Sequence, residues 1–356
     1  MIKTAKILDK DINLLGVIDN YESFSITRRF FECGEFEFKI NSNKLHTDKL
    51  VKNNLILLGK DYNKVGLILH REFVYGEGGQ ETETLLIKGV MLQGLAKRRI
   101  IIHDTGQEFD SCIGNQETIM KYFVNRNCVN PTDLNRRIDN LIVAVDKKRG
   151  ENDRWRGAYE SLDEKLKEIG EYSKLGWNIV LDHKQKKFIF DVMQGKNLTV
   201  NQNTNPPVIF RSDFNNIKTR HYTESIINSR NSLYIGSKEK LVLNLGDITG
   251  FERMETFLDS TSEEVEDIKK EGLVKLEEIK ELKTFELEIN PNSTFVYEKD
   301  YDLGDIVTIQ DKKLKVTMDS RIVEIQEVYG NDGMKLKATF GTRIPSLLAV
   351  LKRMVK

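Results

Sequence analysis

The residues of this sequence that could act as nucleophiles or metal ligands are few and widely separated. The three cysteines form no CxxC pair, and an odd, sparse set indicates buried reduced thiols, not disulfides or a zinc site. A nucleophilic pair would need Cys112 and a distant histidine to meet through folding, and no local signature supports this pairing. The cysteines are Cys33, Cys112 and Cys128, and the histidines are His46, His70, His103, His183 and His221.

Acidic residues offer two further kinds of site. Asp302 and Asp305 lie on either side of Leu303-Gly304 and could hold calcium, but carboxylates at turns more often accept hydrogen bonds from backbone N–H groups. With 55 acidic residues, no particular pair is favoured for glycoside hydrolysis. The chain also lacks the GxxxxGK[ST], GxSxG, HExxH and EF-hand patterns. We therefore assign no catalytic, cofactor-binding or metal-binding residue.

Two basic clusters, Lys97-Arg98-Arg99 and Lys147-Lys148-Arg149, are candidates for contact with nucleic acid. Neither is interleaved with the aromatic residues on which single-stranded bases stack. The chain has 55 basic residues (lysine and arginine) and 55 acidic residues (aspartate and glutamate). It therefore has no excess of positive charge with which to displace counterions from nucleic-acid phosphates. The clusters are better interpreted as solvated faces or as contacts to a neighbouring subunit.

Strands dominate the first part of the chain. Phe36, Phe38 and Ile40 alternate with charged residues, which is the period-2 pattern of a half-buried strand. Further apolar runs lie at 55–58, 65–75 and 84–88. The glycine-rich segment 76–79 between the last two runs predicts a β-hairpin. Several short strands with regular turns indicate a small β-barrel, which we place at residues 1–104.

The middle of the chain combines helices and strands. An apolar stripe with spacings of 4, 3, 4 and 3 predicts one continuous helix, begun by Asn152 or Asp153 and ended by Gly170. The stripe consists of Trp155, Tyr159, Leu162, Leu166 and Ile169. A second helix is expected within 115–128, a hairpin at 177–181 and 187–192, and an exposed loop at 147–156. These elements predict an α/β domain over residues 105–205.

The last part returns to strands and predicts a second β-barrel over residues 206–343. The stretch 208–237 has a β-strand pattern but is polar, as expected for a strand with one face exposed to solvent or covered by another subunit. Thr261 and Glu264 form a capping box for an inserted helix around 261–282. Strand patterns follow at 285–289, 306–309, 314–318, 321–329 and 334–340. A short basic helix is expected within 344–356.

Several short motifs, in one order, resemble a known family. Each motif is weak alone, but their order and spacing cover nearly the whole chain. They are Tyr21-Glu22-Ser23-Phe24, Arg28 to Phe38, Gly66-Leu67-Ile68, Ile87-Lys88-Gly89, Leu95, Arg98-Arg99-Ile100, Gly176-Trp177, Val208-Ile209-Phe210, Tyr222, Asn231-Ser232, Gly250 to Arg253 and Tyr301 to Thr308. The set resembles the bacteriophage tail hub, or baseplate hub, proteins of Gram-positive siphophages, prophages and related contractile particles, also called tail-associated proteins.

The resemblance implies an α+β, β-rich fold with two small tail-tube-like β-barrel domains around the α/β domain. It also implies a homotrimer that forms a pseudo-sixfold ring and closes the tail tube. Its implied partners are the distal tail or tail-tube protein, a spike or fibre protein and the tape-measure protein, with DNA passing through the channel without specific binding. We expect synthesis in the bacterial host cytoplasm, residence in the virion at the tail tip, and no membrane anchor.

Two other functions remain open at this point: a cell-wall hydrolase, or tail-associated lysin, and a carbohydrate-binding adhesion module. Many members of the resembled family carry a peptidase, lysozyme or fibre-like extension, and this chain ends at Lys356 soon after its last expected strand. We therefore expect wall-degrading activity to reside in another protein, and no enzymatic role here. Sugar stacking would depend on Trp155 and Trp177, of which the first lies on the predicted helix stripe.

Overall fold

A computed structural model describes residues 4–74, 83–236, 241–260, 264–331 and 333–341. The chain divides into two compact units. The first unit comprises Met1–Thr219 and Leu287–Ala338, and the second comprises Arg220–Glu286 and Thr339–Lys356. Strands β15, β19 and β22 each continue from one unit into the other, and the units are described separately below.

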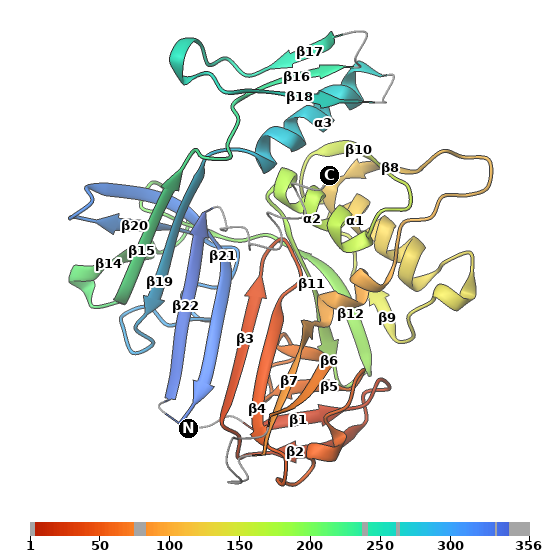
Figure 1. The fold of residues 1–356 in the computed structure, drawn as a ribbon, viewed down its shortest axis with the longest axis vertical. Coiled ribbons are helices and arrows are strands. Elements are labelled where there is room, and N and C mark those ends of the chain that lie inside the picture. The colour runs from red at the N-terminus through yellow and green to blue at the C-terminus, as the bar shows by residue number, and fades with distance from the viewer. Residues whose placement is uncertain (1–3, 75–82, 237–240, 261–263, 332, 342–356) are drawn as a thin grey trace. The chain divides into compact units, whose positions relative to one another are not determined.

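A long, mainly antiparallel sheet organises the first unit (Figure 1). Its strands follow the order β15-β19-β22-β21-β3-β4-β7-β6-β5-β1-β2. Their bounds are β1 Ala5–Leu8, β2 Leu14–Ile18, β3 Ser23–Arg29, β4 Glu35–Asn41, β5 Leu55–Leu58, β6 Val65–Val74, β7 Thr84–Met91, β15 Ile217–Ser225, β19 Leu282–Ile289, β21 Val316–Gly330 and β22 Gly333–Gly341. Strand β20, Ile306–Asp311, pairs with β21 and with the short strands β13, Asn197–Leu198, and β14, Ile209–Arg211. Residues that lie far apart in sequence, such as β3 and β21, thereby become neighbours.

The alternation of side chains along β3, β4 and β21 separates an apolar face from a polar face. Opposite Phe24 lie Phe38 on β4 and Tyr329 on β21, whereas Ser25 lies between Glu37 and Val328. The apolar face forms a core with β1, β5, β6 and β7. This core contains Ala5, Ile7, Ile18, Tyr21, Phe24, Ile26, Phe36, Phe38, Ile40, Leu50, Ile56, Leu58, Ile68, Leu85, Ile87, Met91 and Tyr329. A one-residue slip would exchange the two faces, so burial of these side chains fixes the register.

The remaining elements of the first unit are helices and small sheets. Strand β9, Leu141–Val143, pairs with β12 of the hairpin β11–β12, and β8 pairs with β10. The bounds are β8 Asp110–Asn115, α1 Gln116–Val124, β10 Asn152–Gly157, α2 Leu162–Ser173, β11 Gly176–Asp182 and β12 Lys187–Met193. Short helical turns lie at η1 Thr47–Lys49, η2 Leu92–Arg98, η3 Asn125–Val129, η4 Leu134–Arg136, η5 Ser212–Phe214 and η6 Gly250–Glu252, the last of these in the second unit. The hairpin expected at 177–192 is confirmed.

The second unit contains a three-stranded sheet, β17-β16-β18, with helix α3 beside it (Figure 1). The bounds are β16 Ser232–Gly236, β17 Leu241–Leu245, β18 Glu255–Asp259 and α3 Val265–Glu278. Its core consists of Leu233, Ile235 and Ile268, with partly buried leucines around them. A Cβ atom on Gly272 would lie 2.1 Å from the Ile235 side chain. Glycine at this helical position therefore allows α3 to pack closely on β16.

The continuous helix predicted from the stripe that starts at Trp155 is wrong in its first half. Trp155 lies on β10, where Arg154 and Arg156 point to the opposite face, so the strand period of two is the relevant one. Tyr159 has a positive φ of 58°, which is incompatible with a helix. Helix α2 begins only at Leu162 and continues past the expected stop at Gly170 to Ser173.

The exposed loop expected at 147–156 is also wrong in part, because strand β10 begins at Asn152. The helix expected around 261–282 is confirmed as α3, but α3 spans only Val265–Glu278 and Glu264 is its N-cap residue. The expected capping box, which would place Glu264 inside the first turn, is therefore wrong. Thr261 and the helix expected at 344–356 lie outside the described residues. So do the hairpin tip at 76–79 and one residue of the turn between β21 and β22. The fold is α+β and β-rich, as expected, and no strand pairing among the described residues closes the long sheet into a barrel.

Candidate functional site

The polar face of the long sheet carries equal numbers of acidic and basic residues across β3, β4, β7 and β21. Its ionised side chains are Arg29, Glu35, Glu37, Lys39, Lys88 and Glu324. The register places Glu35 opposite Thr27 and Glu37 opposite both Ser25 and Lys88. Charges of opposite sign therefore alternate across neighbouring strands, and this self-neutralised surface is called the paired face below.

Ion pairs on the paired face form both within and between strands, including strands that are distant in sequence. Arg29 Nη2 lies 2.6 Å from Glu35 Oε1, and Arg29 Nε lies 2.7 Å from Glu324 Oε2. Glu37 accepts contacts from Lys39 at 3.2 Å and from Lys88 at 3.1 Å. Partial burial alone would raise the pKa of Glu37, but hydrogen bonds from Lys88 and Lys39 lower it below its ordinary value. The Glu37 carboxylate is thus ionised and paired with lysines near neutral pH.

Two exposed lysines extend this polar surface onto β22. Lys335 and Lys337 alternate with the buried Leu336 and Ala338. They have no ion-pair partner among the residues that the structure describes. Further along the sheet, Lys218 on β15 lies 3.8 Å from Glu288 on β19. The surface therefore has mixed charge, without the continuous basic stripe that phosphate binding favours.

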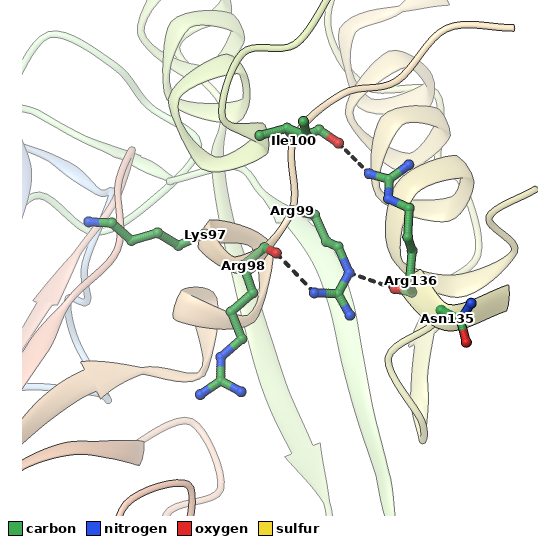
Figure 2. Close-up of a pocket in the computed structure, with 6 residues that line it drawn as sticks. All are labelled: Lys97, Arg98, Arg99, Ile100, Asn135 and Arg136. Atoms are coloured by element: carbon green, nitrogen blue, oxygen red, sulfur yellow. Dashed lines mark hydrogen bonds between the residues drawn. The ribbon is translucent and has the colours of Figure 1, made fainter. Parts of the chain in front are cut away.

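A second polar surface is a shallow hollow of about 300 Å³ in the first unit, lined by Lys97, Arg98, Arg99, Ile100, Asn135 and Arg136 (Figure 2). It is called the arginine hollow below. Arg99 Nε donates to the carbonyl of Arg136, and Arg136 donates to the carbonyl of Ile100. Arg98 donates to Asn53 Oδ1 over 2.7 Å. These neutral acceptors hold three guanidinium groups close together.

No carboxylate among the described residues lies within ion-pair distance of Arg98, Arg99 or Arg136. Partial burial, together with the neighbouring positive charge of Arg99, lowers the pKa of both Arg98 and Arg136. The cluster at 97–99 was visible in the sequence, but no sequence pattern indicated that Arg136 lies beside it. The fold brings Arg136, on η4, next to Arg99, which follows η2. The arrangement can bind an anionic group.

Buried ion pairs elsewhere in the first unit join segments that are distant in sequence. The Lys64 ammonium group, with a side chain that is fully buried, lies 2.9 Å from Asp61, 2.6 Å from Glu298 and 2.9 Å from Glu327. Burial alone would lower the pKa of Lys64, but Glu327 and Asp61 raise it above its ordinary value. This cluster joins the loop before β6 to β21.

A second buried carboxylate, Glu117 on α1, holds the segment that leads to β10. It accepts from Arg149 Nε at 2.8 Å, from Lys121 Nζ at 2.7 Å and from the backbone N–H groups of Lys147 and Arg149. Burial alone would raise its pKa, but these donors, Arg149 first, lower the pKa of Glu117 to about 2. Arg149 is therefore a structural partner, which corrects its interpretation as part of a solvated or subunit-contacting cluster.

No hydrogen bond among the described residues joins Cys112 to a histidine, the pair that the sequence left open for catalysis, and the Cys112 thiol faces the Ile113 carbonyl. Burial and the neighbouring Asp110 raise the pKa of Cys112, so its thiolate is disfavoured. Burial also raises the pKa of Cys33 and of Cys128 to about 12. The histidines have other neighbours: His183 stacks on Tyr62, and His103 packs against Tyr159. Within the described ranges, no group of three histidine, cysteine or acidic residues has metal-ligand geometry.

The acidic turn and the two tryptophans have structural roles. Asp305 accepts from the backbone N–H groups of Asp302 and Lys196, and Asp302 accepts from Arg28 at 2.6 Å. The turn interpretation of these carboxylates is thus confirmed. Trp155 donates to Asp153 and Trp177 to the carbonyl of Phe31, and both indoles are buried. Neither ring offers an open surface to a sugar.

None of the helices in the described part of the chain is both long and apolar enough to cross a membrane.

Three solved tail proteins share this fold over nearly their whole length. The 43 kDa tail protein of prophage MuSo2 from Shewanella oneidensis is 11% identical, with a TM-score of 0.62 over 95% of this chain and 98% of the other. A tail protein from Neisseria meningitidis MC58 is 11% identical, with a TM-score of 0.59 over 95% of both chains. Prophage tail protein gp18 from Listeria monocytogenes EGD-e is 10% identical, with a TM-score of 0.51 over 99% and 98%.

These likenesses define the class of the fold, which is that of phage tail proteins. No curated protein matches the chain in sequence. The model of one protein family matches residues 4–342, and the chain belongs to that family, the Siphovirus ReqiPepy6 Gp37-like proteins. The resemblance to phage tail proteins expected from the ordered motifs is therefore confirmed.

Proposed function

We propose that this bacteriophage tail protein is a non-enzymatic hub subunit, three copies of which form a pseudo-sixfold ring that closes the tail tube at its baseplate end. The observation that carries the proposal is the likeness of the whole chain to prophage tail proteins. The open sheet supports it, because a sheet with unpaired end strands can continue into a neighbouring copy. In this arrangement the two tube-like domains, 1–104 and 206–343, close into barrels.

The ring would join the distal tail or tail-tube protein on one side to a spike or fibre protein on the other. The protein is made in the host cytoplasm and resides in the virion, and the tape-measure protein and DNA pass through the ring. The paired face is suited to line such a channel. Its six ionised side chains neutralise one another, so it offers passing DNA neither a strong repulsion nor phosphate contacts that would retain it.

The oligomeric state is tested by native mass spectrometry of the purified protein, together with its position in a reconstruction of the tail. We expect a trimer at the tube end. A protein that stays monomeric at all concentrations and is found away from the tail tip would overturn the proposal. Incubation with peptidoglycan tests the non-enzymatic role, and cleavage that is lost on one acidic or cysteine substitution would contradict it.

The channel role of the paired face is tested by Glu35→Lys combined with Glu37→Lys in an intact phage. Excess positive charge on the channel wall should bind phosphates and slow DNA ejection. The matched control is Glu108→Lys with Glu151→Lys, which changes the charge equally at exposed positions away from this face. Equal ejection rates for both variants would remove the paired face from the channel.

A further inference from the structure

One loop of the second unit presents a fully exposed aromatic ring between two acidic residues. The loop links β17 to β18 and includes Asp247, Ile248, Phe251 and Glu252. Phe251 is fully solvent-exposed and Ile248 is 41% exposed. The carboxylates of Asp247 and Glu252 have no partner within the described ranges. An exposed aromatic residue with flanking charges is typical of a protein-binding anchor.

The loop is held in shape from within its own unit. Arg253 donates to the carbonyls of Gly246 and Ile248, at 3.4 and 2.8 Å, and its Nε donates to Glu255. Gly246 and Gly250 have positive φ angles of 106° and 67°, which only glycine adopts without strain. Because the loop is ordered before binding, presenting Phe251 costs little conformational entropy at an interface.

The arginine hollow has the complementary character. Its guanidinium groups have no carboxylate partner among the described residues, and Ile100, which lines it, is 43% exposed. Leu134, next to Asn135 in the chain, is 75% exposed. The residues that line the hollow thus include no acidic group and offer apolar contacts, whereas the loop has unpaired acidic groups and an exposed ring. A phenyl ring beside a guanidinium group adds a cation–π contact.

We propose that the loop at Asp247–Glu252 of one copy of this chain binds the arginine hollow of a neighbouring copy. Asp247 and Glu252 would pair with Lys97 and Arg98, and Phe251 would rest on Arg98 and Ile100. A contact between unlike patches of identical chains is heterologous, and such contacts form a ring when the rotation between copies closes, as the proposed threefold ring requires. This inference rests on the proposed ring and assigns one of its subunit contacts.

The test is a charge exchange measured by native mass spectrometry and sedimentation over a range of protein concentrations. Lys97→Glu with Arg98→Glu should weaken association by about tenfold or more, because acidic groups then face Asp247 and Glu252. Asp247→Lys with Glu252→Lys should weaken it similarly. The four substitutions together should restore most of the wild-type association, which a purely structural effect could not do. Phe251→Ala should also weaken it, without loss of fold.

The control is Lys60→Glu with Lys184→Glu, which makes the same charge change at exposed lysines elsewhere in the first unit. Its association should match that of the wild type. If the wild type forms trimers and the hollow variant dissociates no more than this control, the inference fails while the proposed ring stands. A wild-type protein that never associates overturns both. Failure of the fourfold variant to recover, or a hollow that binds duplex DNA in place of a second copy, overturns the inference alone.

Discussion

Lys64 and Arg99 lie in the same unit, but within the described part of the chain the positive charge of Lys64 is compensated by carboxylates and that of Arg99 is not. The ammonium group of Lys64 is buried and has three carboxylates within ion-pair distance. Among the described residues, the guanidinium group of Arg99 donates only to backbone carbonyls, beside two further arginines. An interior charge must be compensated by the chain itself, because water cannot reach it. A partly exposed charge can remain uncompensated until a partner supplies the anion.

The strongest test of this comparison is Lys64→Met, which removes the cation and leaves Glu327 buried without it. We expect the free energy of unfolding to fall by about 3–5 kcal/mol, the usual result of breaking a buried ion pair. Chemical denaturation measures it. Adding Glu327→Gln should recover part of the loss, since the orphaned charge is then gone. If Lys64→Met and the double variant with Glu327→Gln are equally stable, the charge of Glu327 is not compensated by Lys64.

Glu117 sharpens the comparison through pH. Its pKa of about 2 lies below the ordinary value of 4.5, so its stabilisation is complete above the ordinary value and is lost as the pH falls towards 2. Glu117→Gln should therefore cost about 2–3 kcal/mol at pH 7 and flatten the fall in stability between pH 5 and 2. Thermal unfolding across this range measures both effects. An unchanged acid profile in the variant would contradict the role of Glu117.

The paired face should show a smaller effect, because its charges reach water. Glu37→Gln removes the partner of Lys39 and Lys88, whose side chains are nearly half exposed. We expect a loss of less than about 1 kcal/mol, which added salt reduces in the wild type. Denaturation at low and high ionic strength measures it. A loss as large as that of Lys64→Met would mean that the face is covered within the single chain.

The smallest expected effect has the opposite sign and lies in the arginine hollow. Arg98→Gln relieves repulsion from Arg99 while keeping a donor for Asn53, so the isolated chain should be unchanged or about 0.3 kcal/mol more stable. The measurement is thermal unfolding at low salt and at a concentration where the protein is monomeric. A clear loss of stability would show that these charges hold the fold, and the contrast with Lys64 would disappear.

Most of the β-strands could be predicted from the sequence, since alternation such as Phe36-Glu37-Phe38 is a local signal. The failure at Trp155 has a physical cause. Apolar spacing over a strand, a turn and the start of α2 happened to match a helical period, while Gly157 and the positive φ of Tyr159 ended the strand. Local pattern could not reveal that Trp155 pairs with Cys112, which lies 43 residues earlier on β8.

The sequence by itself determined the predominance of strand patterns, the zero net charge and the ordered motifs of the tail family. All three depend only on residue type and on neighbours in the chain. Tertiary structure decided which charges meet. Glu117 and Arg149, Lys64 and Glu327, and Arg99 and Arg136 are distant in sequence and are joined by strand order and helix packing. A count of charges cannot distinguish a paired arginine from an unpaired one, since that depends on distances set by the whole fold.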